Sequence, residues 1–596
     1  MTFIKKYIVE NFSNFTFFYK VLRTRLLIVI LLSSITAVLD SFGLAMFLPL
    51  LQLADGGNNS VDLGKLNFIT SLIERLQIPF TISVALFILF FVFFTKAIAV
   101  YVSSIYKLKT QQILTKDLRM TIVNKFPFFS YNNFVKTDVG QIQNIFVGEI
   151  SRVANTYTSY VQMMQGLVMV LVYLTFSIVI NWQFALLVAV GGLLSNLIFS
   201  KINKATKEKS KDLSEAGNTF AGLLIQYVQN FKYLKATARI MDYRHKIETS
   251  IDETQTINFN IGNLNSKVVA FREPILIGII CLVILLEVKV FEVSMSEVLV
   301  SLLFFYRALT SIVAIQTSHS NTISNQGAID NFLDFNEKLD LGKEKIGEKP
   351  FSNFNSEIQL SNVSLDYDNI KVLDDVNITI EKNQTVAFVG ESGAGKTTLI
   401  NVISQLLRPK SGSYRIDGGE ISEINQFDFQ KKVGYISQEP SIFSDTIYNN
   451  VTFWAPKTLE NILQFEKAMR SASLWEMLSD LPDKEETLLG NTGINLSGGQ
   501  RQRISIAREL YKDVEILILD EATSALDSAT EKEIQKSIIE MQGHLTFLII
   551  AHRLSTIKHA DVIYFMKKGK IEAHGSFNEL IEKSSDFSRM VSLQNI

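Results

Sequence analysis

Cysteine is nearly absent from this chain of 596 residues, since the only one is Cys281. A single thiol excludes a disulfide framework, a CxxC metal site and a redox pair within the chain. Proline is scarce as well, and nine residues exclude a proline-rich scaffold. Charge of one sign is also missing, because 58 Lys and Arg against 59 Asp and Glu give a net charge of −1. A basic field over the whole chain, as for nucleic acid, is therefore excluded.

Hydrophobic residues make up 47% of the sequence and charged residues only 20%. Long disordered regions are not expected at this composition, nor is a purely soluble protein. The length is enough for about three to four average domains. The long apolar runs lie almost entirely before residue 340, which predicts two unlike halves.

Six apolar runs are close to the length of about 20 residues that crosses a bilayer core. They cover residues 26–53, 82–101, 157–180, 182–199, 268–286 and 293–315. We therefore predict an α-helical transmembrane domain over residues 1–335. Its helices are expected to extend into the cytoplasm, because Phe220–Leu234 keeps apolar residues at helical spacing.

Positive charges predict the orientation of these spans, because cytoplasmic loops are enriched in Lys and Arg. With the N-terminus inside, segments 1–25, 102–154 and 201–267 hold 23 Lys and Arg, against three in the external segments. Both termini and the second half of the chain are therefore expected in the cytoplasm. We expect no cleavable signal at the N-terminus, where scattered aromatic residues predict an interfacial helix or a plain flanking helix.

The second half has the pattern of a soluble α/β domain over residues 351–596, after a charged linker at residues 336–350. A short apolar run at residues 384–389 predicts a buried strand. Gly390-Glu-Ser-Gly-Ala-Gly-Lys396-Thr397 follows at once, and residues 398–407 then predict a helix. Strand, GxxxxGK[ST] and helix in this order is the context that a P-loop requires.

The residue types of this loop suit a bound phosphate. Glycines let backbone N–H groups close on phosphate, and the helix N-terminus adds positive potential. Lys396 is expected to reach the β- and γ-phosphates, and the Thr397 hydroxyl to bind Mg²⁺. The predicted nucleotide contacts here are Gly390, Ser392, Gly393, Gly395, Lys396, Thr397 and Thr398.

Two further motifs complete a nucleotide site. The apolar strand 515–520 ends in two carboxylates, of which Asp520 suits a Mg²⁺ ligand and Glu521 suits polarising the attacking water. In Leu496-Ser-Gly-Gly-Gln500, Ser497 is expected to cap a helix over residues 501–510. The two glycines allow a close approach of phosphate.

With these motifs in order, the chain resembles the ATP-binding cassette (ABC) family, in its exporter branch, over nearly its whole length. The resemblance implies a six-span transmembrane domain of the exporter type, followed by an α/β P-loop nucleotide-binding domain, with ATP and Mg²⁺ as cofactors. It also implies that Tyr367 stacks on adenine, that Gln438 links Mg²⁺ to the membrane domain, and that His552 senses the γ-phosphate. The signature residues Ser497, Gly498, Gly499 and Gln500 are implied to bind the γ-phosphate. Asp527 is implied to lie in the loop that crosses between the cassettes.

The resemblance further implies a dimer, because one chain supplies one P-loop and one signature for a site shared between two cassettes. A homodimer is the economical expectation, and a heterodimer with a related chain is the alternative. Alternating access is expected to be coupled through intracellular helices near Ser130–Gln143 and Gln226–Leu234. The chain departs from the exporter pattern in Thr487–Gly493, where Asn491 stands in place of an acidic residue. This departure puts the details of coupling in question, and not hydrolysis.

Charges inside the spans are the first candidates for substrate contacts. Asp40 lies in the first span, Arg272 beside Glu273 in the fifth, and Arg307 in the sixth. Arg307 suits an anionic group such as phosphate, or alternatively pairs with Asp40 or a backbone carbonyl. Arg272 and Glu273 alternatively form a structural pair near the cytoplasmic end.

Residues 67–78 place apolar side chains on one helical face, which predicts a helix on the outer membrane surface or one packed on the span ends. This helix, the run 39–51 and the run 303–309 with Arg307 are similar to bacterial flippases of lipid-linked oligosaccharides. We therefore expect an ATP-driven exporter or flippase of a lipid-linked oligosaccharide or another anionic amphiphile, in the bacterial inner membrane. The alternatives are a drug, lipid or peptide exporter of the same architecture, and a membrane ATPase that acts as a sensor. No nucleic-acid partner is expected.

Overall fold

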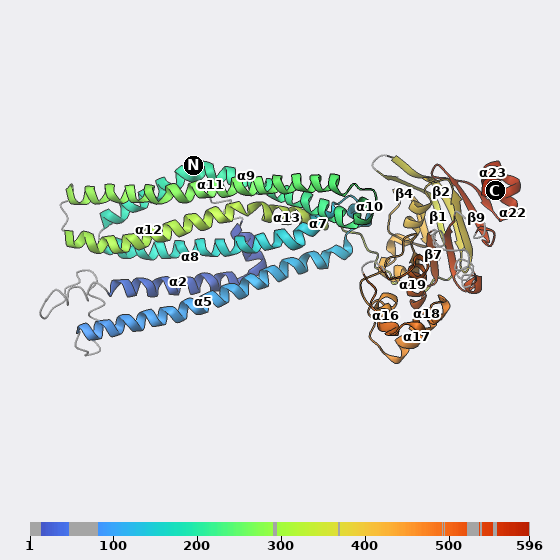
Figure 1. Cartoon of the computed structure of the whole chain (residues 1–596), viewed down its shortest axis with the longest axis horizontal. Coiled ribbons are helices and arrows are strands. Elements are labelled where there is room, and N and C mark those ends of the chain that lie inside the picture. The colour runs from blue at the N-terminus through green and yellow to red at the C-terminus, as the bar shows by residue number, and fades with distance from the viewer. Residues whose placement is uncertain are drawn as a thin grey trace. The chain divides into compact units, whose positions relative to one another are not determined.

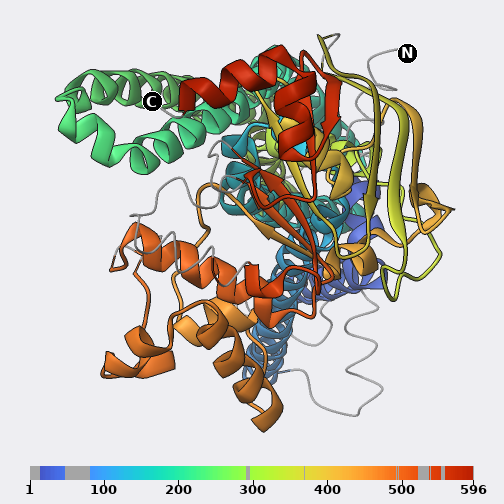
Figure 2. The same cartoon turned by 90° about the vertical axis from the view of Figure 1, so that its right-hand side faces the viewer.

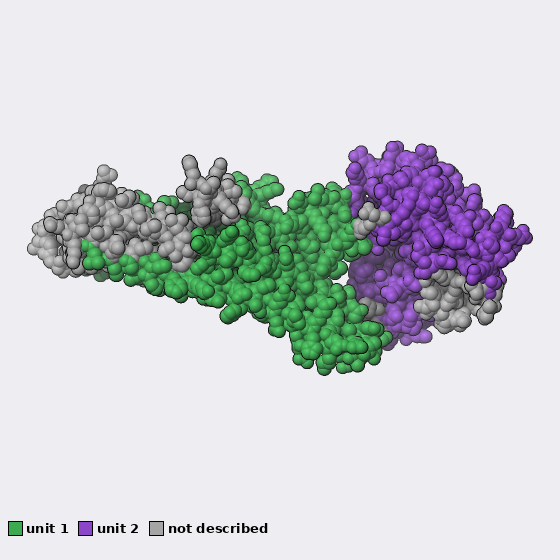
Figure 3. All heavy atoms as spheres, turned by 90° about the horizontal axis from the view of Figure 1, so that it is seen from above, with its two compact units in different colours: residues 1–129, 133–343 green, residues 130–132, 344–596 purple. Residues whose placement is uncertain are grey.

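The computed structural model describes residues 14–46, 81–180, 182–289, 295–367, 370–490, 493, 495–520, 536, 539–551 and 557–594. The chain divides into two compact units, coloured separately in Figure 3. The first contains residues 1–129 and 133–343, and the second contains residues 130–132 and 344–596. The boundary after Lys343 falls inside the predicted linker, although a helix, α13 (Gln326–Leu341), continues through the first residues of that range.

Long helices run side by side along the first unit (Figure 1). They are α2 (Thr24–Ala45), α5 (Ile82–Lys125), α8 (Ile150–Ile180), α9 (Trp182–Gln229), α11 (Ile240–Lys289) and α12 (Met295–Ser324). Each predicted span overlaps one of these helices, and several helices extend well past the apolar run. Residues 47–53 of the first predicted span and the predicted external helix at 67–78 lie outside the described residues.

Within the described part of the chain, three helical stretches are long and apolar enough to cross a membrane. They cover Thr24–Gly43, Ile82–Phe128 and Val139–Thr175. In the second of them only 6% of the apolar window is buried inside the protein. Such an apolar helix without internal cover requires an apolar environment such as lipid or another chain.

The aromatic N-terminal segment packs into the helical bundle. Residues 14–22 are helical, and Phe18 is fully buried. Its ring lies 5.5 Å from the rings of both Tyr157 and Tyr160 on α8. Burying a side chain of this size stabilises the fold by about 1.5–3 kcal/mol. For these residues the flanking helix is therefore favoured over the interfacial one.

Short helices occupy both segments predicted to couple the two halves. The helices α6 (Tyr131–Val135) and α7 (Val139–Asn144) fall near the first, and α10 (Phe231–Ala236) overlaps the second. Asp138 caps α7 by accepting a hydrogen bond from Gly140 N at 2.6 Å. A Cβ atom on Gly140 would lie 2.3 Å from Gly222 N, so α7 packs on α9 backbone to backbone.

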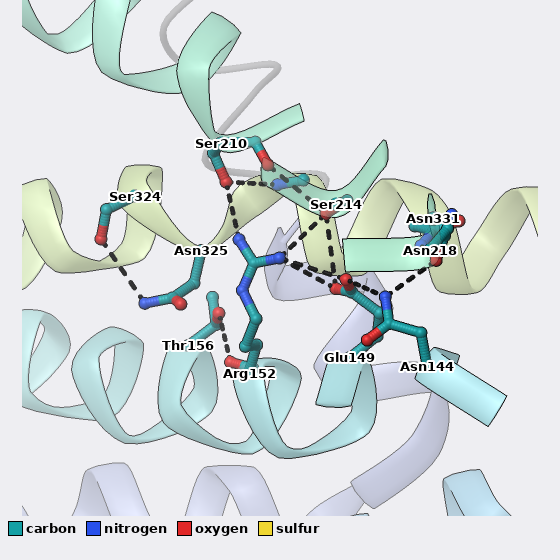
Figure 4. Close-up of polar contacts among 11 residues, drawn as sticks. Asn144, Glu149, Arg152, Thr156, Ser210, Ser214, Asn218, Ser324, Asn325 and Asn331 are labelled. Carbon is teal, nitrogen blue, oxygen red and sulfur yellow. Dashed lines mark hydrogen bonds and ion pairs between the residues drawn. The ribbon is translucent and has the colours of Figure 1, made fainter. Parts of the chain in front are cut away.

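A buried polar network joins α8, α9 and α13 beside the π-helical turn η3 (Ile145–Glu149), as Figure 4 shows. The Glu149 side chain is 2% exposed and accepts two hydrogen bonds from Arg152 Nη1, at 3.1 and 3.2 Å. Arg152 also donates to Ser214 Oγ at 2.9 Å and to Ser210 Oγ at 3.2 Å. Ser210 Oγ in turn accepts from Gly327 N at 3.0 Å, which ties α9 to the first turn of α13.

The second unit contains two sheets (Figure 2). The antiparallel sheet has the strand order β2-β1-β4-β5, and the six-stranded sheet has the order β10-β9-β3-β8-β7-β6. The strands are β1 (Glu357–Tyr367), β2 (Ile370–Glu381), β3 (Thr385–Gly390), β4 (Ser411–Ile416), β5 (Gly419–Glu420), β6 (Val433–Ile436), β7 (Ile516–Asp520), β8 (Thr546–Ile550), β9 (Val562–Lys567) and β10 (Lys570–Gly575).

The helices of this unit either cover the six-stranded sheet or, in the case of α16 to α18, form a separate group that is drawn in orange in Figures 1 and 2. They are α14 (Lys396–Ile403), α15 (Gln426–Lys431), α16 (Ile447–Thr452), α17 (Leu459–Ser471), α18 (Trp475–Asp480), α19 (Gly498–Tyr511), α22 (Phe577–Lys583) and α23 (Ser585–Gln594). Every residue of β3 and β8 is buried, as expected for parallel strands covered on both faces.

Candidate functional site

The parallel strands of the second unit bring the predicted nucleotide motifs to one edge of the sheet. The strands β3, β8, β7 and β6 run parallel, and Ile550 of β8 pairs with Phe388 of β3 on one side and Asp520 of β7 on the other. The P-loop begins two residues after Phe388, at Gly390. Ligands of open α/β sheets bind outside the carboxyl ends of the strands, where these residues lie.

The P-loop has the backbone that its glycines predict. Gly393 has φ +81° and Gly395 has φ +99°, values that favour glycine. Gly395 is the N-cap of α14, and a Cβ atom there would lie 2.9 Å from Val372 O. The helix ends at Ile403, before the predicted residue 407, because Gln405 adopts a left-handed backbone with φ +58°.

Lys396 lies at the first position of α14 and is only 6% exposed. Its Nζ atom donates to Gly390 O at 2.8 Å and to Glu391 O at 3.0 Å, so its charge is held inside the loop. Thr397 and Ser392 are exposed, and Thr398 is half-buried. A cation, exposed hydroxyls and helix N-terminal N–H groups together form an anion site of the kind that binds phosphate.

The oxygen donors predicted for Mg²⁺ gather at the same edge. Asp520 ends β7, Gln438 follows β6 by two residues, and Thr397 begins α14. Among the residues that the structure describes, no cage of three or more His, Cys, Asp or Glu side chains is present. Carboxylate, amide and hydroxyl oxygens fit Mg²⁺, which is usually held by one or two carboxylates together with substrate phosphates.

The signature segment forms a capping box at the start of α19. Ser497 Oγ accepts from Gln500 N at 3.2 Å, and Gln500 Oε1 accepts from Ser497 N at 2.8 Å. The cap is confirmed, but the helix starts at Gly498 and not at the predicted residue 501, because the box satisfies the first-turn N–H groups. Ser497 and Gly498 are exposed, so this helix N-terminus is open to a ligand.

Arg508, further along α19, ties the signature helix to the loop that follows Gln438. Its guanidinium donates to Asn450 O at 2.6 Å and to Ser441 O at 2.7 Å, and lies 5.3 Å from the Phe443 ring. The side chain is 4% exposed, and burial lowers its pKa. The arginine therefore holds the Gln438 loop and the signature helix together.

Tyr367, the predicted adenine contact, ends β1 and is half-buried. Burial raises the pKa of its phenol, and a hydrogen bond with Thr398 opposes that rise. The half-buried aromatic ring suits stacking on a base. Glu521, Asp527, His552 and Asn491 lie outside the described residues, and their predicted roles stay predictions.

In the membrane-spanning helices, Asp40 has partners other than Arg307. Asp40 on α2 is 4% exposed, forms an ion pair with Lys96 on α5, and accepts a hydrogen bond from the Tyr173 hydroxyl on α8. Arg307 on α12 is exposed. The expected alternative that Asp40 pairs with Arg307 is therefore not what the structure has. Arg272 lies on α11, and its side chain is outside the described part.

Tyr435 is a site residue that the sequence motifs did not indicate. It lies on β6, three residues before Gln438, and its hydroxyl donates to Asp520 Oδ2 at 3.1 Å. The available signal for this residue was an aromatic side chain with a polar end. It stands just before a predicted site loop and on a strand beside the aspartate. Only the pairing of β6 with β7 shows that the two side chains meet.

Comparison with known proteins agrees with this geometry. The family model of the ABC transporter transmembrane region matches residues 26–315, and the model described as ABC transporter matches residues 373–524. An ATP-dependent lipid A-core flippase of Desulfotalea psychrophila is 30% identical over 521 residues, covering 84% of this chain and 88% of the relative. The heterocyst differentiation ATP-binding protein HepA of Nostoc sp. is 30% identical over 488 residues, covering 81% and 79%.

A solved structure of a bacterial Atm1-family ABC exporter with ATP bound has the same fold. It aligns with 97% of this chain and 99% of its own length, with a TM-score of 0.76 and 21% sequence identity. The P-loop, the signature helix and the apolar helices thus occur in the order and fold that the sequence predicts. The chain therefore belongs to the ABC transporter family, binds ATP, and couples ATP hydrolysis to transport across a membrane.

Proposed function

We propose that this protein moves an amphiphile with an anionic glycan headgroup, such as a lipid-linked oligosaccharide, across the bacterial inner membrane. Support comes from the exposed Arg307 on α12 and from relatives named as lipid A-core flippases. A guanidinium suits a phosphate group in the headgroup of an anionic amphiphile.

The ion pairing of Asp40 supports Arg307 as the substrate contact. Because Lys96 and Tyr173 both bind the Asp40 carboxylate, the acidic group of the first span is already engaged. An arginine in a membrane-spanning helix is costly unless it faces a polar group, a cavity or a ligand. An anionic headgroup that enters between the helices meets this requirement.

The working unit is proposed to be a homodimer with two shared ATP sites. Each chain carries one P-loop at Gly390–Thr397 and one signature at Ser497–Gln500. In the proposed site the signature of one chain contacts the γ-phosphate held by the P-loop of its partner. Asp527 lies in the loop that crosses between the cassettes, and ATP binding closes them.

For hydrolysis, Thr397, Gln438 and Asp520 are proposed to hold Mg²⁺, which neutralises phosphate charge when bound. Glu521 polarises the attacking water, and His552 senses the γ-phosphate. The short helices α6, α7 and α10 carry cassette motion to the spans and so drive alternating access. The positive charges of the intracellular segments support cytoplasmic termini and a cytoplasmic ATPase domain.

A fluorescent lipid-linked oligosaccharide in sealed proteoliposomes tests the proposed cargo. We expect ATP-dependent loss of accessible glycan with the wild-type protein and none with Glu521→Gln, which keeps ATP binding but has lost the base. A parallel series with lipid A-core separates the two glycolipid cargoes. If neither lipid moves while ATPase activity is intact, the cargo proposal is wrong, and drugs, peptides and simple lipids become the candidates. If none of these candidates is transported either, the alternative of a membrane ATPase that acts as a sensor is favoured.

Replacing Arg307 by alanine is expected to slow lipid flipping while leaving basal ATPase activity in place. The loss of one charge-assisted contact corresponds to about 1.5–3 kcal/mol, or roughly 10- to 100-fold in headgroup affinity. Arg307→Lys is the matched control, because it keeps the charge without the planar fork and should fall between the two. Flipping by Arg307→Ala at the wild-type rate would remove this residue from the substrate path.

A further inference from the structure

Tyr435 contacts the aspartate at the end of the neighbouring strand. In the parallel pairing of β6 with β7, Tyr435 lies opposite Ile518. Side chains two residues apart on a strand share one face, so Asp520 lies on the face of Ile518. The half-buried phenol reaches along that face, and its hydroxyl donates to Asp520 Oδ2 at 3.1 Å.

The backbone at Tyr435 is fixed by the signature helix. Tyr435 N lies 3.4 Å from Glu509 Oε2 of α19, and that carboxylate is also bound by Lys512 at 2.6 Å. Glu509 is 5% exposed. A Cβ atom on Gly434 would lie 2.7 Å from Leu517 Cδ1 and 3.3 Å from Glu509 Cβ, so a larger residue there would require both neighbours to shift. Tyr435 therefore contacts both α19, through its backbone N–H, and Asp520, through its hydroxyl.

We propose that Tyr435 is a positioning residue that fixes the Asp520 carboxylate for the metal ion that accompanies ATP. The proposal rests on the proposed metal role of Asp520. A carboxylate rotates about its own bond unless a neighbour holds one oxygen, and the phenol holds Oδ2. Removing a hydrogen bond to a metal ligand typically lowers metal affinity by about 10- to 100-fold.

The experiment measures metal affinity directly, with the full-length protein in detergent. Mn²⁺ binding is followed by electron paramagnetic resonance in the presence of a non-hydrolysable ATP analogue. Tyr435→Phe is expected to raise the Mn²⁺ dissociation constant by about 10-fold. Nucleotide affinity in EDTA is expected to be unchanged, and the ATPase rate to recover at high Mg²⁺, so that the apparent KM for Mg²⁺ changes more than kcat.

Tyr564→Phe is the matched control. Its hydroxyl lies in the same sheet, on β9, donates to Thr379 O at 2.8 Å and accepts from Thr379 N at 3.1 Å, so the variant loses hydrogen bonds of the same phenol type away from Asp520. Wild-type Mn²⁺ affinity in Tyr435→Phe overturns the proposal, as does an equal loss of affinity in Tyr564→Phe. An equal loss of nucleotide affinity in EDTA also overturns it, because the effect would then be structural.

A third variant separates this proposal from the one on which it rests. Asp520→Asn is expected to weaken Mn²⁺ binding more than Tyr435→Phe does. If Asp520→Asn weakens it and Tyr435→Phe does not, only the positioning role fails. If Asp520→Asn leaves Mn²⁺ affinity unchanged, the metal role of Asp520 itself is wrong, and the role of Tyr435 falls with it.

Discussion

Replacing Lys396 by alanine is expected to reduce ATP hydrolysis by about 100-fold or more, the scale seen when a preorganised charge-stabilising donor is removed from an active site. Lys396 is 6% exposed and its ammonium is held by the carbonyls of Gly390 and Glu391, within the loop proposed to surround the phosphates. No other cation of the P-loop can replace it, because Gly390–Thr397 contains a single basic residue. ATPase activity and binding of a fluorescent nucleotide measure the effect.

Lys410→Ala is the control for the loss of a lysine in the same unit. Lys410 is 71% exposed and pairs with Asp366 at the surface, so its removal should leave hydrolysis near the wild-type rate. Thermal unfolding without nucleotide shows whether Lys396→Ala still folds. A folded Lys396→Ala protein with normal turnover would contradict the assignment of the P-loop.

The same variant tests whether the site is shared between two chains. Co-expression of Lys396→Ala with Ser497→Arg gives mixed dimers in which one site has an intact P-loop and an intact signature. Part of the ATPase activity should return, although each variant alone is inactive. Absence of any recovery in purified mixed dimers would count against a site built from two chains.

Replacing Arg152 by alanine is expected to destabilise the first unit by about 3–5 kcal/mol, the usual cost of removing one partner of a buried ion pair. Glu149 is 2% exposed, and its carboxylate would lose the guanidinium that donates to both of its oxygens. Ser210 and Ser214 would lose donors at the same time, and α9 would be less firmly joined to α8. The midpoint of heat-induced aggregation in detergent measures the loss.

Arg239→Ala is the matched control for this variant. Arg239 pairs with Asp242 one turn away, but the two side chains are 72% and 64% exposed, so the pair contributes little to stability. A double variant with Glu149→Met and Arg152→Met should recover much of the stability, because it removes the buried charges together. Equal midpoints for Arg152→Ala and Arg239→Ala would show that the network does not stabilise the unit.

The nucleotide site was largely predictable because its chemistry is local in sequence. A P-loop phosphate site requires glycines, a lysine and a hydroxyl close together in the sequence, so Gly390–Thr397 can be recognised without knowledge of the fold. Ser497 was predictable as a cap for the same reason, although the helix starts three residues earlier than expected. The long helices were predictable because apolar residues must fill the thickness of a bilayer.

Contacts between distant segments were not predictable. The partner of Asp40 depends on which helices meet, and the structure brings Lys96 and Tyr173 to it and not Arg307. The contact of Tyr435 with Asp520 depends on the register of two strands far apart in the sequence. Motifs report what one segment binds, whereas these pairs depend on how segments pack.

The assignment of residues 130–132 to the second unit has a consequence for biosynthesis. These residues leave the ribosome long before Glu344, whose carboxylate accepts a hydrogen bond from the Tyr131 backbone and whose pKa is raised by burial. The second unit therefore cannot complete its native surface from its own later stretch of chain. The packing of this unit is therefore complete only when an early and a late stretch of the chain have both been synthesised.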